Sequence, residues 1–519
     1  MPNAPQQPSD LVAVLDMGAS AIRLVVGQIT PSRRTRVIEE ASRGILLGRD
    51  TFSTGTIRSQ TLDTALTAIE GFRQIMRGYN VGHVRAVATS AVREARNAEM
   101  VLDRIRGRTG IDFEIINEAE ESRLIYLAVR HALGKHSVFK GAWTMLVEVG
   151  GGSTSVTLLR RGQANRSGVY ALGAIRMRQQ LNLKSHTHDL QITLLKRYIA
   201  NVIEEIRVEI PLRQVMHVVA IGGDVRFAAG QIVEQEQDGV REVPRDAFLA
   251  FCDEVERHDE DGLVDRFRLP VVEAETLVPS LLVYRALLSE TTARQVIVSD
   301  ASIRAGILLD MSAAGGRMEA EDFQQQVLAS AETLGHKYRF DRAHGHHVAQ
   351  LSVALFDQLR GEHGLSERDR LLLHVAALVH DIGVYVSLRA HHKHSQYLLG
   401  ASQIFGLTDE ETAIVANITR YHRRGLPQRS HLAYAALDRS ARIIVTKLGA
   451  MLRVANALDA EHLQKVQTLR LIRQDRGWIL EIEGTGDLTM EQMAATARAD
   501  MLTQTFGKSV VIRTAGVVQ

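Results

Sequence analysis

The sequence predicts an α/β protein with two lobes of similar design, followed by an all-helical domain and a small α/β cap. An apolar strand, an acid with a glycine turn and a second apolar strand open the chain at residue 11. The same succession returns at residue 145, which predicts a second lobe of the same kind. Beyond residue 320 the apolar residues recur at helical spacing until about residue 466, which predicts the helical domain.

The first lobe, predicted over residues 10–133, begins as a meander, because its first three strands are joined without room for a crossover helix. Strand and helix patterns alternate after this meander. The expected strands are 11–15, 22–29, 36–47, 83–89 and 113–116, and the expected helices are 60–77, 95–108 and one that begins at Glu118.

The second lobe, predicted over residues 134–315, repeats this order in structure but not in sequence. The expected strands are 145–149, 154–159, 169–172, 217–221 and 296–298, and the expected helices are 190–209 and one that begins at Ser302. A cleft between two such lobes is the natural place for a ligand.

The rest of the chain is predicted to form a helical domain over residues 318–466 and a small α/β domain over residues 467–519. The last part has strand patterns at 468–472, 478–482 and 509–512, with a helix over 491–506 between the last two.

Composition limits the class of protein. The chain has 519 residues, more than one hydrophobic core usually holds, with 45% hydrophobic and 24% charged residues and a net charge of +2. This balance is not that of a nucleic-acid-binding protein, and no specific nucleic acid is expected as a partner. Cys252 is the only cysteine, residues 1–10 lack the pattern of a signal peptide, and no apolar run is long enough for a membrane span. We therefore expect a cytoplasmic protein.

Three glycine turns carry the prediction of a phosphate site. The first runs from Asp16 to Ser20, the second from Glu148 to Thr154, and the third is Gly222-Gly223. Glycine lets the backbone approach a phosphate closely, and successive N–H groups form an anion-binding nest. An acid at the end of a strand can hold Mg²⁺. A single turn of this kind is more often an ordinary β-turn, but three at corresponding places in two lobes favour a ligand site.

These residues resemble the Ppx/GppA phosphatases, a family of the actin, sugar-kinase and Hsp70 superfamily, whose lobes have the ribonuclease H-like (ASKHA) fold. The lobes match it in residues 16–18, 85–93, 120–124, 150–154, 172–176 and 299–306. The helical part matches in residues 338–356, 378–383, 391–398 and 452–459.

The resemblance implies release of the terminal phosphate of inorganic polyphosphate, or of the 5′ phosphate of guanosine pentaphosphate, with Mg²⁺ or Mn²⁺ as cofactor. It implies that Glu121 is the base that activates water and that Arg93 faces the phosphate; the alternative for both is a surface pair at helix starts. It implies that Asp16 and Glu148 hold the metal, and that the protein is a homodimer. The implied phosphate-binding residues are Gly18, Ser20, Gly150, Gly151, Gly152, Ser153, Gly222 and Gly223.

The chain departs from the family pattern around the metal. The first turn usually reads Asp-x-Gly-Ser-Asn-Ser, but here Ala19 and Ala21 remove polar groups. Glu148 stands where an aspartate is usual, Ser155 where a glutamate is usual, and Asp224 where a threonine or isoleucine is usual. Two alternatives to a working hydrolase therefore stay open: a binding regulator with weakened catalysis, and a sugar- or acetate-type kinase of the same superfamily. The motif at residues 120–124 argues against the kinase.

The histidine-rich helical part resembles an HD-type domain. His344, His380 and Asp381 match three ligand positions of the HD metal site, and Asn456 stands where the fourth, an aspartate, is expected. Asp459 is one turn further along and could replace it only poorly. We therefore expect a degenerate site that binds little metal, with a working site as the alternative. The basic segment at residues 420–424 has two equally supported interpretations: a surface that binds a long polyanion, or an ordinary solvated face.

Overall fold

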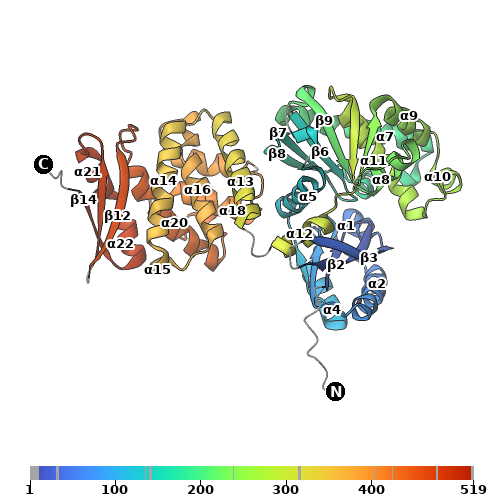
Figure 1. Cartoon of the computed structure of the whole chain (residues 1–519), viewed down its shortest axis with the longest axis horizontal. Helices are drawn as coiled ribbons and strands as arrows, with labels where there is room; N and C mark the ends of the chain where they lie inside the picture. Colours follow the sequence, from blue (N-terminus) through green and yellow to red (C-terminus); the bar gives the residue numbers. More distant parts are fainter. Residues whose placement is uncertain are drawn as a thin grey trace, which may run out of the picture. The chain divides into compact units, whose positions relative to one another are not determined.

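The computed structural model describes residues 11–30, 34–134, 136–139, 143–237, 239–313, 317–402, 404–423, 425–474 and 477–515. The chain divides into two compact units, Met1–Ala320 and Glu321–Gln519 (Figure 1), and each is described by itself. The residues considered for a signal peptide, 1–10, lie outside the described part.

The first lobe of the first unit is built on a five-stranded sheet in the order β3-β2-β1-β4-β5. β1 pairs antiparallel with β2 and parallel with β4, so the predicted meander is followed by crossovers. The strands are β1 (Leu11–Met17), β2 (Ala21–Ile29), β3 (Thr35–Gly44), β4 (His83–Ala88) and β5 (Phe113–Ile115). The helices are α1 (Leu47–Thr54), α2 (Ser59–Gly78), α3 (Ser90–Arg93), α4 (Ala98–Thr109) and α5 (Glu118–Leu133). The strand predicted at 36–47 was too long, because β3 ends at Gly44 and α1 begins three residues later.

The second lobe has a six-stranded sheet in the order β10-β11-β9-β6-β7-β8, which also opens with an antiparallel meander and continues with a parallel strand. The strands are β6 (Trp143–Val149), β7 (Thr154–Arg160), β8 (Gln163–Tyr170), β9 (Val215–Ile221), β10 (Val240–Pro244) and β11 (Gln295–Ser299). The helices are α6 (Ala174–Gln180), α7 (His188–Glu209), α8 (Gly223–Ile232), α9 (Arg245–Glu256), α10 (Glu260–Phe267), α11 (Val271–Ser289) and α12 (Ile303–Ala313). The third strand predicted at 169–172 is in fact β8, because the chain turns tightly around Gly162.

Two helices tie the lobes together. α12 follows the last strand of the second lobe and packs against α5 of the first. The contact is close: a Cβ on Gly306 would lie 2.0 Å from the carbonyl oxygen of Leu124. Only glycine permits this approach, and the contact fixes the end of β11 and the start of α12 relative to α5. The α/β part of the predicted fold is confirmed.

The second unit combines helices with a three-stranded sheet in the order β12-β13-β14. Side chains from both parts share one hydrophobic core, in which Leu452 of α20 and Leu480 of β13 are both fully buried. Its helices are α13 (Arg317–Lys337), α14 (Arg342–Gln358), α15 (Arg360–His363), α16 (Glu367–Val379), α17 (His391–Gly400), α18 (Asp409–Arg420), α19 (Leu432–Ala435), α20 (Arg439–Ala457), α21 (Thr489–Arg498) and α22 (Asp500–Phe506). Its strands are β12 (Val466–Gln474), β13 (Gly477–Gly484) and β14 (Ser509–Thr514). The helix predicted at 491–506 is thus two helices.

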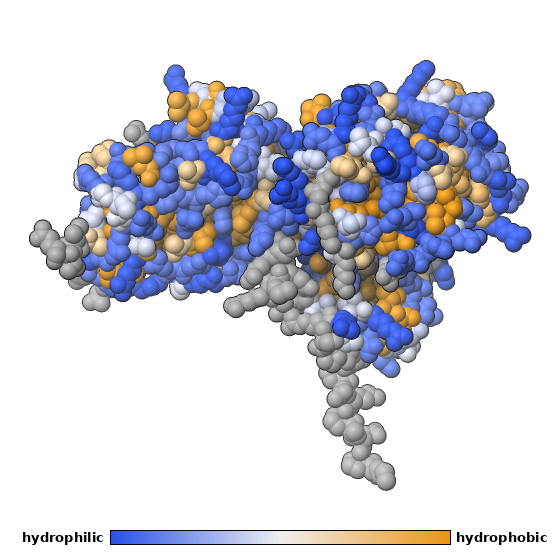
Figure 2. Space-filling view, turned by 45° about the horizontal axis from the view of Figure 1, so that its top comes forward, coloured by the Kyte–Doolittle hydropathy of each residue, from blue (hydrophilic) through white to orange (hydrophobic). Residues whose placement is uncertain are grey.

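Hydrophilic residues cover much of the face visible in Figure 2, with scattered hydrophobic ones between them. Within the described ranges, no helix has the length and apolar character that crossing a membrane requires.

Candidate active site

A cleft of about 610 Å³ lies in the first unit between the two lobes. All three glycine turns line it, as do the ends of β1, β6 and β9 that lead into them. The predicted residues that line it are Asp16, Gly18, Ser20, Glu121, Glu148, Gly150, Gly151, Gly152, Ser153, Gly222 and Gly223. The topology therefore brings together side chains and turns that are far apart in sequence, because equivalent strands of the two sheets end at the same place.

The first two turns have the same hydrogen bond. The N–H of Gly18 donates to the carbonyl of Ala21 (3.0 Å), and the N–H of Gly150 donates to the carbonyl of Ser153 (2.9 Å). The second turn also lies close to the first lobe: a Cβ on Gly152 would lie 2.2 Å from Oγ of Ser90 at the start of α3. Glycine is therefore required where the two lobes meet.

The third turn has a different geometry. Gly222 has a φ of 135°, a conformation that disfavours any side chain, and it caps the N-terminus of α8. A helix N-terminus presents unpaired N–H groups and favours a bound anion. Asp224 in the first turn of α8 is half-buried; its partial removal from water raises its pKa, and it accepts hydrogen bonds from Thr276 and Ser280. Those bonds to α11 give Asp224 a structural role at the back of the cleft.

Three carboxylates, Asp16, Glu121 and Glu148, face the cleft from three different elements, β1, α5 and β6. Burial raises the pKa of Glu121 to about 7, and the charges of Asp16 and Glu118 add to the rise while Arg93 opposes it. Burial, with the charges of Glu121 and Asp16, raises the pKa of Glu148 to about 8. The three groups thus act on one another, and a cation among them would favour their ionised forms.

Arginine side chains of the protein supply part of the positive charge that favours the ionised carboxylates. Nη1 of Arg304, at the start of α12, lies 3.1 Å from Oδ2 of Asp16, and Nη1 of Arg23 lies 3.9 Å from the same atom. The charge of Arg226 lowers the pKa of Glu148. All three arginines line the cleft. Sequence reasoning gave them no role, although Arg304 stands inside a stretch that matched the family and could have been singled out there.

Arg93 occupies a different place from the one predicted. Its Nη1 donates to the carbonyl of Ile116 (2.7 Å) and lies 3.6 Å from Oε2 of Glu121, while Nη2 lies 3.5 Å from Oε1 of Glu118. Arg93 is not among the described residues that line the cleft. It lies behind Glu121, where its charge holds down the pKa of that carboxyl group.

Ser155 lies beside the candidate base. It pairs directly with Glu148 across β6 and β7, so both side chains project from the same face of the sheet. Oγ of Ser155 is 3.3 Å from Oγ of Ser122, the residue after Glu121. A longer side chain at residue 155 would therefore extend toward the start of α5.

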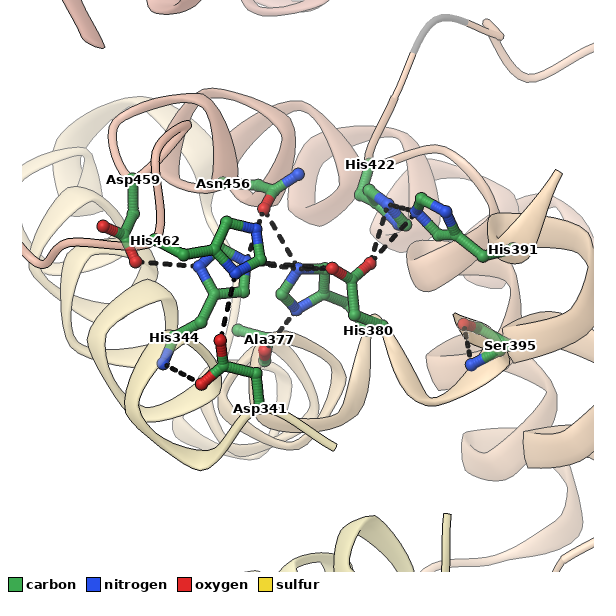
Figure 3. A network of polar contacts seen from close by, with 12 residues as sticks. Asp341, His344, Ala377, His380, His391, Ser395, His422, Asn456, Asp459 and His462 are labelled. Atoms are coloured by element: carbon green, nitrogen blue, oxygen red, sulfur yellow. Dashed lines mark hydrogen bonds and ion pairs between the residues drawn. The ribbon is translucent and has the colours of Figure 1, made fainter. Parts of the chain in front are cut away.

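The second unit brings together the four residues predicted for the degenerate HD-type site, of which Figure 3 labels His344, His380 and Asn456. Oδ1 of Asn456 lies 3.1 Å from Nε2 of His344 and 3.0 Å from Nε2 of His380, and Oδ2 of Asp381 lies within 3.8 Å of both nitrogens. Asp459 does not replace the missing acid as a ligand: its Oδ2 accepts a hydrogen bond from Nδ1 of His344 (2.8 Å), on the far side of the ring.

The basic segment predicted at residues 420–424 is not a continuous surface track. Tyr421 and His422 are fully buried, and only Arg423 is exposed; Arg420 is half-buried and Arg424 lies outside the described residues. The segment turns inward because α18 ends at Arg420, after which the His422 side chain points toward His391.

The fold and the cleft define a two-lobed α/β protein with a carboxylate-lined, glycine-rich ligand site. The family model described as the Ppx/GppA phosphatase family matches residues 25–314, which is more than half of the chain. The model for Ppx/GppA phosphatase domain III matches residues 328–495. The chain belongs to the Ppx/GppA phosphatase family.

Curated relatives agree at modest identity. The chain is similar to a guanosine-5′-triphosphate,3′-diphosphate pyrophosphatase of Photobacterium profundum, with 21% identity over 450 residues, 84% of this chain and 85% of the relative. A protein of the same name from Vibrio vulnificus is 22% identical over 437 residues, 80% of this chain and 82% of the relative. A solved exopolyphosphatase structure from Cytophaga hutchinsonii is 20% identical, with a TM-score of 0.54, and covers 59% of this chain and 98% of that one. This last likeness shows the fold only, over the part of the chain that it covers.

Proposed function

We propose that the protein is a phosphoanhydride hydrolase that releases the terminal phosphate of inorganic polyphosphate or the 5′ phosphate of guanosine pentaphosphate. The observation that carries the proposal is Glu121, a carboxyl group whose pKa burial raises to about 7 and which lines the same cleft as the three glycine turns. A base with a pKa near the working pH combines an ionised fraction with enough basicity to take a proton from water. The names of relatives add support for the two substrates.

In this proposal the backbone N–H groups of the turns at Gly18 and Gly150 hold the oxygens of the terminal phosphate. Glu121 orients a water molecule and accepts its proton as the phosphoanhydride bond breaks. Arg93 is a positioning residue, because it acts through Glu121 rather than on the phosphate. Arg304 and Arg226 supply positive charge where negative charge gathers on the phosphate oxygens.

The residues present fit Mg²⁺ or Mn²⁺ as cofactor. Asp16, Glu121 and Glu148 offer the oxygen ligands that such a cation prefers, and burial raises the pKa of Glu121 and Glu148. Asp16 and Glu148 would hold the cation, which would neutralise the phosphate and ease departure of the leaving group. Predicted features that depend on assembly, such as the homodimer, are testable by light scattering of the purified chain.

A second candidate function is a binding regulator with weakened catalysis. The pairing of Asp16 with Arg304 favours it, because an arginine that already neutralises the acid competes with a metal ion. The regulator and the hydrolase share the same cleft and the same ligands, and differ only in turnover.

The deciding experiment measures phosphate release from long-chain polyphosphate and from guanosine pentaphosphate, with and without Mg²⁺. The hydrolase should release phosphate only with the metal, and Glu121→Gln should lower kcat about 10²–10⁴-fold with little change in substrate affinity. Glu120→Gln is the matched control, because Glu120 is the neighbouring acid but pairs with Arg123. Binding without release by the parent would establish the regulator instead. Activity of Glu121→Gln within a few-fold of the parent would remove Glu121 from the mechanism.

A further inference from the structure

The histidine cluster of the second unit is larger than the predicted HD-type set. His391, at the start of α17, and His422, after α18, point toward it from the other side (Figure 3). Their Nε2 atoms lie 3.1 Å and 3.3 Å from Oδ1 of Asp381, and 3.2 Å from each other. Asp381 thus stands between two pairs of histidines, with Oδ2 toward His344 and His380 and Oδ1 toward His391 and His422.

The hydrogen bonds on the outer side of each ring define its tautomer. In every one of the four histidines Nδ1 meets an acceptor, so Nδ1 carries the proton. The acceptors are Asp459 Oδ2 for His344 (2.8 Å), the carbonyl of Ala377 for His380 (2.7 Å), the carbonyl of Leu388 for His391 (3.1 Å) and the carbonyl of Thr419 for His422 (2.6 Å). In the neutral ring, Nε2 is then an acceptor, and all four Nε2 atoms face inward. Outer hydrogen bonds of this kind are typical of histidines that bind metal.

The inward-facing atoms form a set of acceptors without a donor. The Nε2 atoms of His344 and His380 are 3.3 Å apart, and those of His391 and His422 are 3.2 Å apart. Within each pair, the lone pair of one nitrogen therefore faces the lone pair of the other. Oδ1 of Asp381 is buried and receives no hydrogen bond of acceptable geometry, although two nitrogens lie close to it. Groups buried in this way are unfavourable unless a cation or a proton lies between them.

Protons resolve the arrangement only if one ring of the cluster is charged. Turning the side-chain amide of Asn456 would let its NH₂ group donate to both His344 and His380. That change satisfies the first pair only. The second pair would need an added proton on His391, whose pKa Asp381 raises, and hence a charged ring beside the fully buried His422. One positive ion in each half satisfies all the acceptors together.

We propose that the second unit binds two divalent transition-metal ions bridged by Asp381. The first ion would be held by His344, His380, Oδ2 of Asp381 and Oδ1 of Asn456, and the second by His391, His422 and Oδ1 of Asp381. Four imidazoles favour Mn²⁺, Fe²⁺, Co²⁺ or Zn²⁺ over Mg²⁺ or Ca²⁺. Three protein ligands leave the second ion with an open position for water or an anionic oxygen. This centre is independent of the hydrolase proposed for the first unit, and it replaces our expectation from sequence that this domain binds little metal.

The test is titration of the full-length, metal-free chain with Co²⁺, read by visible absorption and by elemental analysis. We expect His391→Gln/His422→Gln to bind one Co²⁺ fewer than the parent, and Asp381→Asn to lose that ion and bind the other at least tenfold more weakly. His394→Gln, on the same helix α17, is the matched control and should bind as the parent does. The cleft of the first unit is unchanged in all variants, so any Co²⁺ bound there cancels in the comparison.

A folded double variant, by circular dichroism, that binds as much Co²⁺ as the parent would overturn the proposal. A second measurement needs no variant. The parent loaded with Mn²⁺ should give the electron paramagnetic resonance spectrum of an exchange-coupled pair, since ions that share one carboxylate lie about 3.5–4 Å apart. A spectrum of isolated Mn²⁺ alone, at saturating metal, would equally overturn it.

Discussion

Nη1 of Arg304 lies 3.1 Å from Oδ2 of Asp16, and both side chains are largely withdrawn from solvent, at 13% and 7% exposed. The acid that ends β1 therefore has a partner from α12, which follows the last strand of the second lobe. Arg304 occupies the side of Asp16 at which a metal ion would compete for the same oxygen. If Asp16 holds a metal ion as we propose, the pair would link the stability of the cleft to the presence of that ion.

Removing Arg304 should make the folded protein depend on Mg²⁺. In Arg304→Met the buried Asp16 loses its main partner, a change that typically costs up to about 3–5 kcal/mol. A metal ion can then bind the vacated carboxylate, so Mg²⁺ should raise the melting temperature of the variant more than that of the parent. Thermal unfolding with and without Mg²⁺ measures both effects.

Arg23→Met is the control for this prediction. Arg23 lies 3.9 Å from the same oxygen but is 35% exposed, so its loss should cost less than about 1 kcal/mol. Equal destabilisation by the two substitutions, or no added effect of Mg²⁺ on Arg304→Met, would show that Arg304 is not the main partner of Asp16.

Hydrolysis should rise with pH up to the pKa of Glu121 and then level off. The working form of Glu121 is the carboxylate, and burial raises its pKa to about 7. A cation beside Glu121 favours the ionised form, so with the metal bound the midpoint should lie below 7. Below that midpoint the group is protonated and cannot accept a proton from water, so the rate should fall about tenfold per pH unit. Above it the rate should level off. The dependence of kcat on pH, at saturating substrate, measures this profile.

Arg93→Met should move the same profile to higher pH. The positive charge of Arg93 favours the ionised form of Glu121, so its removal raises the pKa of that carboxyl group further. A purely structural role for Arg93 would lower the rate at every pH without moving the midpoint. Arg93→Lys keeps the charge, so the midpoint of its pH profile should stay close to that of the parent.

Gly152→Ala should loosen the contact between the lobes. The added Cβ would lie 2.2 Å from Oγ of Ser90 and 2.8 Å from Cζ of Phe52, so the two lobes must move apart. Overpacking of this kind costs about 1–3 kcal/mol. Gly223→Ala is the control, because a Cβ added there would have no other atom within 4 Å and the residue begins a helix. A chemical denaturation curve unchanged by Gly152→Ala would contradict the close contact.

Local signals in the sequence were enough to predict much of the first unit. β1 and β6 are apolar strands that end at an acid and a glycine turn, and both were expected close to their observed places. α11 was not expected, because it is apolar on nearly every side and so shows no helical period. α1 was missed for a different reason: it follows β3 almost directly, and the apolar run continues across the junction.

Among the site residues, those in short local motifs were predicted, and those brought together by packing were not. Asp16, Glu121 and Glu148 were predicted because each belongs to a short motif. Contacts between distant segments were not predictable: Arg304 reaches an acid 288 residues earlier, and His391 meets His422 across 31 residues and two helices. Only the packing of α17 and α18 shows that these histidines share Asp381.

The last prediction concerns the two substituted acids. Glu148 and Ser155 are direct cross-strand partners, and Ser155 approaches Ser122, beside Glu121. In Glu148→Asp/Ser155→Glu the first change withdraws a carboxylate by about 1.5 Å and the second adds one on the same face. We expect faster phosphate release and a lower Mg²⁺ requirement, because together they restore the family's arrangement of acids around the metal. The effects should not be additive, since both side chains act on one group of charges.

The single variants separate charge from shape. Ser155→Glu alone adds a carboxylate beside Glu148, whose pKa is already raised to about 8 by burial and by neighbouring acids, so it should slow hydrolysis. Ser155→Gln, of the same length without the charge, should have a smaller effect. The assay is phosphate release from one polyphosphate preparation across a Mg²⁺ series. A double variant no faster than a parent that already turns over at about 1–10³ s⁻¹ would mean that Glu148 serves the cleft as well as the usual aspartate does.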